Sequence, residues 1–268
     1  MNNKRKIRHL VSYCISVLTG ATIALILLAA NYEFAVYDPE NLAASFEKSD
    51  YFNEQKQTAE QALNALAESA DLPEGFLDMD DYADDFERDM RSQVYGRNDR
   101  VADLESIGVA EILGERLDSQ GIKRTIQSDM GILKLGDDVS AILRENSQVP
   151  GMEEWWAAKE QAGRVSVVLA ASMTVLLIAE CLVLWLIQTR KKQTFRYLSV
   201  AAFLGGAAGM IGTVCLYKRI RAPGGEALAA VWEIYRTSML TTGMKLAAVA
   251  LLIGLILAVI RIALRGEG

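Results

Sequence analysis

The sequence contains few of the side chains on which common enzyme chemistry depends. Among its 268 residues there are one histidine, His9, three cysteines and four prolines. A single histidine excludes most histidine-based catalysis and most zinc sites, which need several imidazole or thiolate ligands. Three cysteines are too few for the disulfide framework of a small secreted domain.

The sequence also lacks the short motifs of familiar active sites. It has no nucleophile elbow, no phosphate-binding loop, no HExxH and no CxxC, and no pair of carboxylates is singled out by its spacing. It has no basic patch with interleaved aromatic residues of the kind that binds nucleic acid. We therefore expect a protein that is not an enzyme, needs no cofactor or metal ion and does not bind nucleic acid.

Long apolar runs, in contrast, occur four times. A helix needs about 20 apolar residues to cross the hydrocarbon core of a bilayer. Runs of this length lie at about 10–30, 165–187, 197–217 and 244–264, and the second contains the acid Glu180. The sequence therefore predicts four transmembrane helices.

The basic residues beside these runs predict the orientation of the chain. They cluster before the first run, between the second and third, and after the fourth: Lys4, Arg5, Lys6 and Arg8; Arg190, Lys191, Lys192 and Arg196; Arg261 and Arg265. Because short cytoplasmic flanks are rich in Lys and Arg, we expect both termini in the cytoplasm and segment 31–164 outside. Lys218, Arg219 and Arg221 in the outer loop 218–243 run against this rule but are outnumbered.

The first apolar run has a second interpretation. A basic start followed by an apolar stretch also describes a secretory signal peptide, whose apolar part usually has 7–15 residues. The stretch here is longer, and Leu28-Ala29-Ala30 is a weak cleavage site. We expect residues 1–30 to be a cytoplasmic N-terminus and a retained anchor, whereas cleavage would leave three spans.

The net charge of −6 is the sum of two opposite regions. Segment 31–164 has 30 acidic and 13 basic residues, a net charge of −17, and the rest of the chain has a net charge of +11. The outer segment contains no cysteine, and the chain has no Asn-x-Ser/Thr acceptor. An acidic exterior without disulfides or glycosylation sites is typical of a bacterial cell-surface domain.

The outer segment has the pattern of several helices. Asp38-Pro39-Glu40 is a helix start, and we expect one helix from there to about Ala70, ended by Leu72-Pro73-Glu74-Gly75. A second helix from near Asp78 should bury Tyr82, Phe86, Met90 and Val94 at four-residue spacing. A third should carry Val109, Ile112, Leu113 and Leu117, and a fourth should fill 122–148, divided at Gly136.

Glu180 is the sharpest candidate for a functional residue. A carboxylate in hydrocarbon is costly, so it must be protonated, paired or turned into a cavity. It is interpreted either as a proton or cation site or as a neutral acid hydrogen-bonded across the bundle. Counted from the shared inner loop, Gly205, Gly206 and Gly209 of the third span lie at its depth, so their close approach could cover it.

Two further groups of residues are candidates for packing and for the membrane interface. Small residues recur every four positions in each span, with Gly20, Gly205, Gly209 and Gly254 as candidate helix-packing positions in the bundle or in a homo-oligomer. Trp155 and Trp156 precede the second span, where interfacial aromatics are expected. Trp232 and Tyr235 share a stripe in loop 218–243, which predicts an amphipathic helix on the membrane surface or, preferably, packed on its own protein.

An acid-dense stretch begins near the second outer helix. It contains Asp78, Asp80, Asp81, Asp84, Asp85 and Asp89, but Ala83 stands where a calcium loop requires glycine. We therefore expect a solvated helix face with favourable N-terminal charge rather than a calcium site.

Three short segments carry a resemblance to a family. Ser49-Asp50-Tyr51-Phe52, Leu72-Pro73-Glu74-Gly75-Phe76 and Val94-Tyr95-Gly96 resemble a group of uncharacterised four-span membrane proteins of Gram-positive bacteria. The resemblance covers about residues 36–120 and implies the same plan, with one anchor, a helical outer domain and three further spans. It implies no activity.

Together these patterns predict an all-α protein. Its four-helix transmembrane bundle would hold a helical extracytoplasmic domain, 31–164, between the first and second spans, and 165–268 would form the other three. We expect a multi-pass protein of a bacterial plasma membrane, in contact with lipid. It would act as an accessory, sensing or interaction protein with an envelope partner or as a homo-oligomer. The alternative is a transporter or channel component that uses Glu180.

Overall fold

The computed structural model describes residues 3–73, 75–96, 104–119, 126–188, 191–219 and 228–266. Every regular element in these ranges is a helix, so the prediction of an all-α protein is confirmed for the described chain. The chain forms two compact units. We call Met1–Asn41, Ala157–Arg221 and Glu233–Gly268 the membrane unit, and Leu42–Trp156 and Ala222–Trp232 the acidic unit.

Four helices in the described chain are long and apolar enough to cross a membrane. They are α1 (Asn3–Asn31), α7 (Met152–Ile187), α8 (Lys191–Arg219) and α9 (Ala229–Gly266), and a π-helical turn, η1 (Tyr32–Val36), continues α1. The prediction of four helices with the length and apolarity of membrane spans is therefore confirmed. With 36 and 38 residues, α7 and α9 are longer than the roughly 20 residues that a bilayer core requires.

The fourth span begins much earlier than its apolar run. The sequence predicts loop 218–243 as a separate outer segment, but α8 extends to Arg219 and α9 already starts at Ala229. No proline or glycine interrupts residues 229–242, so the amphipathic stripe passes directly into the apolar stretch. The region from 229 to 243 is therefore the start of the fourth helix.

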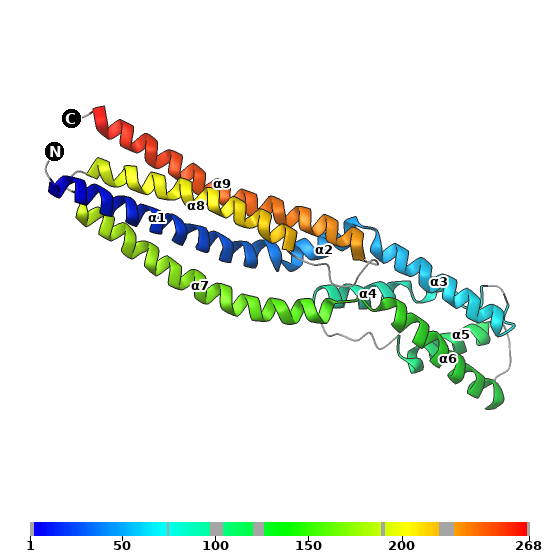
Figure 1. Ribbon diagram of the computed structural model, residues 1–268. Coiled ribbons are helices and arrows are strands. Elements are labelled where there is room, and N and C mark those ends of the chain that lie inside the picture. Colours follow the sequence, from blue (N-terminus) through cyan, green and yellow to red (C-terminus); the bar gives the residue numbers. More distant parts are fainter. Residues whose placement is uncertain are drawn as a thin grey trace. The chain divides into compact units, whose positions relative to one another are not determined.

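The membrane unit is built around the pair α1 and α8 (Figure 1), which run parallel along their length. In the most apolar stretch of each helix, 33% of α1 and 39% of α8 is buried, but only 11% of α7 and 17% of α9. Helix α7 contacts α1, and α9 contacts α8. The two flanking helices thus keep most of their apolar surface free for lipid.

Three helices of the membrane unit meet at the buried side chain of Asn31. Its amide nitrogen donates to Thr213 Oγ1 of α8 at 3.0 Å, and Thr213 in turn donates to the carbonyl oxygen of Gly209. Gly243 of α9 packs against both side chains, and a Cβ there would lie 2.5 Å from Thr213 Cγ2. A buried amide is costly without partners, so this bond specifies the register of α1 against α8.

The acidic unit consists of shorter helices: α2 (Pro39–Lys48, from Leu42 on), α3 (Tyr51–Ser69), the 3₁₀ turn η2 (Met79–Asp81), α4 (Ala83–Val94), α5 (Ser106–Ser119) and α6 (Ile126–Ser147). The expected helix from Pro39 to Ala70 is in fact two helices. Asp50, with φ of +61°, separates them, and Asp tolerates this left-handed conformation better than most residues. The bend lets the rings of Phe46 and Tyr51 pack edge to face, with their centroids 5.4 Å apart.

The predicted core face of α4 is confirmed. Phe86, Met90 and Val94 are all at most 1% exposed, as is Tyr82 just before the helix. Gly136 does not divide α6, which is continuous from Ile126 to Ser147. It lets α5 approach instead, because a Cβ at Gly136 would lie 3.1 Å from Ala110 Cβ.

Gln93 at the end of α4 joins three segments of the acidic unit. Its amide nitrogen lies 3.0 Å from Asp89 Oδ2 and from the carbonyl oxygen of Ser147, and its amide oxygen accepts from Val149 N. Its own carbonyl oxygen accepts from Trp156 Nε1 at 3.1 Å. The residue therefore connects α4 to the α6–α7 connection and to the first turn of α7.

Candidate functional site

Glu180 lies in α7 with its carboxyl group covered by α1. The residue is 5% exposed, and its Oε1 atom is 3.1 Å from Thr22 Oγ1. Thr22 Oγ1 is also 3.1 Å from the carbonyl oxygen of Leu18, one turn earlier in α1. A threonine hydroxyl has one proton to donate. The Leu18 carbonyl oxygen and Glu180 Oε1 therefore share the single proton of Thr22.

The second carboxyl oxygen of Glu180 has no such contact. Oε2 is buried and has no hydrogen-bond partner among the described residues. A buried polar atom without a partner is costly, and in native proteins it calls for a specific explanation. This atom is the feature of Glu180 that a purely structural role leaves unexplained.

Two other polar contacts accompany Glu180 along the same pair of helices. At one end Gln188 Nε2 donates to Ser12 Oγ, and at the other Ser166 Oγ donates to Glu33 Oε2 at 3.1 Å. We call these contacts, together with Thr22–Glu180, the polar seam. Because positions rise along α1 as they fall along α7, the seam fixes an antiparallel pairing of the two helices.

The glycines of α8 do not cover Glu180, contrary to the expectation from depth alone. A Cβ at Gly205 would lie 2.6 Å from Ile23 Cβ and 2.9 Å from Gly20 O, both in α1, and one at Gly209 would lie 2.8 Å from Leu27 Cδ1. Gly254 of α9 packs on Ala202 and Phe203 of α8. These glycines, with Gly20, allow α1 to pack on α8 and α8 to pack on α9. The depth of a residue along its helix does not show which neighbouring helix its face contacts.

Three of the candidate interfacial aromatics are buried within the protein, and the fourth, Trp156, is half-buried. Trp155 and Trp232 are 5% and 2% exposed, and Trp156 donates to Gln93 O within the acidic unit. Tyr235 is 1% exposed and donates to the carbonyl oxygen of Val36 in the membrane unit. They are therefore packing residues, since both helices begin before the apolar stretch and their first turns carry protein-facing side chains.

Other aromatics of the membrane unit are exposed near the two ends of its helices. Tyr13 and Trp185 are 41% and 42% exposed near one end of α1 and α7, and Tyr32 and Phe34 are 36% and 61% exposed after the other end of α1. The 19 residues from Tyr13 to Tyr32 correspond to about 28 Å of helix, close to the thickness of a bilayer core. Exposure, which the sequence does not show, distinguishes these residues from the buried ones.

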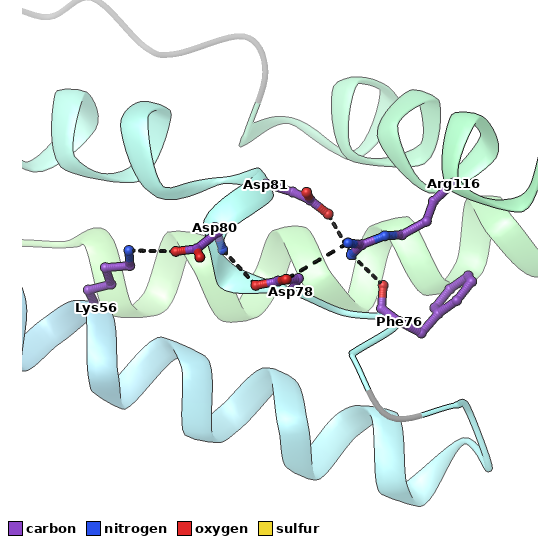
Figure 2. A network of polar contacts seen from close by, with 6 residues as sticks. All are labelled: Lys56, Phe76, Asp78, Asp80, Asp81 and Arg116. Carbon is purple, nitrogen blue, oxygen red and sulfur yellow. Dashed lines mark hydrogen bonds and ion pairs between the residues drawn. The ribbon is translucent and has the colours of Figure 1, made fainter. Parts of the chain in front are cut away.

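In the acidic unit the acid-dense stretch is matched by cations (Figure 2). Arg116 of α5 lies 2.6 Å from Asp81 and 3.8 Å from Asp78, and it donates to the carbonyl oxygen of Phe76 at 3.0 Å. Asp78 accepts from Asp80 N, which caps η2, and Asp80 pairs with Lys56 of α3. The bond to Asp80 raises the pKa of Lys56.

This network gives Asp78, Asp80 and Asp81 a structural role. In the described chain no group of three or more His, Cys, Asp or Glu side chains is arranged to hold a metal ion. The aspartates instead cap η2 and fasten the Phe76–Asp81 segment to α3 and α5, as Figure 2 shows. The stretch is held to α3 by the more exposed ion pair Lys56–Asp80 and to α5 by the less exposed pair Arg116–Asp81.

Replacing Arg116 with alanine should destabilise the acidic unit by about 2 kcal/mol, the cost of losing hydrogen bonds to charged groups and leaving Phe76 O unpaired. The Arg116 side chain is 25% exposed. The control is Lys56→Ala, whose pair with Asp80 is 37% and 81% exposed and should contribute less than about 1 kcal/mol. Chemical unfolding curves measure both, and equal effects of the two substitutions would contradict the assignment.

No family model, curated protein or solved structure matches this chain.

Proposed function

We propose that this protein is a multi-pass protein of a bacterial plasma membrane that acts as an accessory, sensing or interaction protein through its acidic unit. The four apolar helices support membrane insertion. The basic residues that flank the apolar runs support cytoplasmic termini with segment 31–164 outside. The close packing of α1 on α8 supports a retained first span rather than a cleaved signal peptide. The resemblance to four-span proteins of Gram-positive bacteria remains part of this proposal.

The observation that carries the proposal is that the acidic unit and the membrane unit are separate compact units. The acidic unit has its own buried core, with Phe46, Leu63, Phe86 and Leu143 at most 1% exposed. It therefore has the internal packing needed to present a stable, negatively charged surface. In the membrane unit, most polar groups of the polar seam form hydrogen bonds between helices. A folded acidic domain in the same chain as a packed membrane unit is suited to binding an envelope partner.

Topology can be tested by labelling single cysteines. Cys14, Cys181 and Cys215 are free and are replaced with alanine first. In intact cells a membrane-impermeant maleimide should then label Gln57→Cys, at an exposed position of α3, but should label Lys6→Cys only after lysis. The reverse pattern would overturn the proposed orientation.

The interaction role predicts a partner on the acidic unit. A photo-crosslinking amino acid at exposed position Gln57 should capture one defined envelope protein from native membranes, whereas the same group at lipid-exposed Leu186 should not. Capture of only a second copy of this chain from position 57 would favour the homo-oligomer. Equal capture from both positions would contradict the role proposed for the acidic unit.

A second candidate function rests on the unpartnered Oε2 of Glu180. In a transporter or channel component this atom would bind a proton or a cation during transport. The isosteric change Glu180→Gln keeps an acceptor for Thr22 and should leave folding and partner capture unchanged. If reconstituted wild-type protein shows proton or cation flux that Glu180→Gln abolishes with folding intact, the transporter is correct and the accessory role fails.

A further inference from the structure

One end of the membrane unit holds most of its unsatisfied polar atoms. The described chain has seven buried side-chain nitrogen or oxygen atoms without a hydrogen-bond partner. Four lie where the start of α1, the end of α7 and the start of α8 converge: Arg8 Nε, Gln188 Oε1, Gln193 Oε1 and Thr194 Oγ1. We call this group the basic-end cluster. Gln188 is 3% exposed and Thr194 is 1% exposed, so these groups are built into the fold.

Contacts between the three helices hold the cluster together. Ser12 of α1 accepts from Nε2 of Gln188, the residue directly after α7, and donates to the carbonyl oxygen of Arg8. His9 Nδ1 is 2.6 Å from the hydroxyl oxygen of Tyr197 in α8, whose backbone oxygen accepts from Ser16 Oγ. Gln193 and Thr194 stand four and three residues before Tyr197 and therefore share its face of α8, which is turned to α1.

The cluster combines donors with acceptors. Arg8 Nε and the Thr194 hydroxyl can donate, and the amide oxygens of Gln188 and Gln193 can accept. Arg8 forms no ion pair with a carboxylate among the described residues. A partly buried guanidinium group favours an anion, and the free amide oxygens require hydroxyl or amine donors. One ligand that meets both demands carries a phosphate and free hydroxyl groups.

The depth of the cluster agrees with a lipid headgroup. Arg8 precedes the exposed aromatic Tyr13 by five residues, about 7.5 Å of helix. If Tyr13 marks the edge of the hydrocarbon core, Arg8 lies in the headgroup layer. Basic pockets between transmembrane helices bind anionic headgroups at this level.

We propose that the basic-end cluster binds the headgroup of phosphatidylglycerol. The phosphate accepts from Arg8 and Thr194, and the glycerol hydroxyls donate to the amide oxygens of Gln188 and Gln193. The proposal rests on membrane insertion but not on the accessory or transport role, and it holds whichever face of the membrane is cytoplasmic. It accounts for four buried atoms that protein contacts leave unsatisfied.

Charge-matched lipids test the proposal on the full-length protein in detergent. Native mass spectrometry and thermal unfolding compare phosphatidylglycerol with phosphatidylmethanol, which has the same phosphodiester charge but no hydroxyl groups. We expect wild type to retain phosphatidylglycerol about tenfold better, the effect of one or two hydrogen bonds. Gln193→Leu should abolish that preference. Equal retention of the two lipids by wild type would overturn the proposal.

A pair of variants separates a built site from general attraction to basic residues. Arg8→Gln and Lys6→Gln remove the same charge from the same helix, but Lys6 is exposed. Arg8→Gln should weaken phosphatidylglycerol retention about tenfold or more, and Lys6→Gln should change it little. Equal losses would show nonspecific attraction and overturn the site.

Two further measurements keep the test decisive. If Arg8→Gln does not fold, Thr194→Val replaces it, because it is nearly isosteric and should lose the stabilisation by phosphatidylglycerol while unfolding normally without lipid. Unchanged stabilisation of Thr194→Val would contradict the proposal. Soluble sn-glycerol 3-phosphate offers the same polar groups without acyl chains. If it stabilises the protein as strongly as the lipid does, the ligand is a free phosphate and the lipid assignment is wrong.

Discussion

Replacing Gly96 with alanine should destabilise the acidic unit by about 2–4 kcal/mol, the sum of backbone strain and overpacking. Gly96 has φ of +66°, a conformation that residues with a Cβ adopt at a cost. A Cβ there would also lie 2.6 Å from Cε2 of Trp156. The ring would have to move, and its hydrogen bond to Gln93 O would be lost.

The matched control for this prediction is Gly75→Ala. Gly75 has φ of +73° but no atom within 4 Å of its Cβ position, so the change introduces strain without a clash and should cost about 1 kcal/mol. Thermal unfolding of the full chain, followed by tryptophan fluorescence, should show a midpoint about 10 °C lower for Gly96→Ala. A shift no larger than that of Gly75→Ala would mean that the ring contact contributes nothing.

Replacing Gly205 with valine should separate the two central helices of the membrane unit. A Cβ at this position would lie 2.6 Å from Ile23 Cβ and 2.9 Å from the backbone oxygen of Gly20, so α1 and α8 cannot keep their distance. We expect a loss of about 3 kcal/mol, at the upper end of the usual cost of overpacking. Because Thr22 lies in the same part of α1, its contact with Glu180 should weaken as well.

Ala208→Val is the control for this second prediction. Ala208 is exposed in the same helix, three residues further on, and its enlargement should change stability by less than about 0.5 kcal/mol. The midpoint of heat-induced loss of monodisperse protein in detergent, measured by size-exclusion chromatography, compares the variants. Similar midpoints for Gly205→Val and Ala208→Val would contradict the packing of α1 on α8.

Local features of the acidic unit show how far sequence patterns reach. The spacing of Phe86, Met90 and Val94 predicts the buried face of α4, because one helical face is a local property of the chain. No proline or glycine marks the break at Asp50 in the sequence, and only the structure shows that it brings Phe46 against Tyr51. At Gly136 the sequence suggests a break, but the structure shows a continuous helix. The glycine is the position at which α5 packs closely on α6.

The candidate site follows the same distinction. Glu180 is conspicuous in the sequence because an acid in an apolar run is rare. Its partner is Thr22 of α1, however, and not a residue of α8, the next helix along the chain. The burial of Trp155 and Trp232 and the basic-end cluster likewise cannot be read from the sequence. Exposure and missing hydrogen-bond partners are properties of the assembled helices.

The sequence by itself determined that the chain has four apolar helices and one acid-rich helical segment. Crossing a bilayer requires length and apolarity, and a helix satisfies its backbone hydrogen bonds within one stretch of chain. Only the tertiary structure decided which faces meet: Gly205 on α1, Thr22 on Glu180, and Trp156 over Gly96. These choices depend on side chains that are distant in sequence, and close packing selects among pairings that the sequence patterns allow equally.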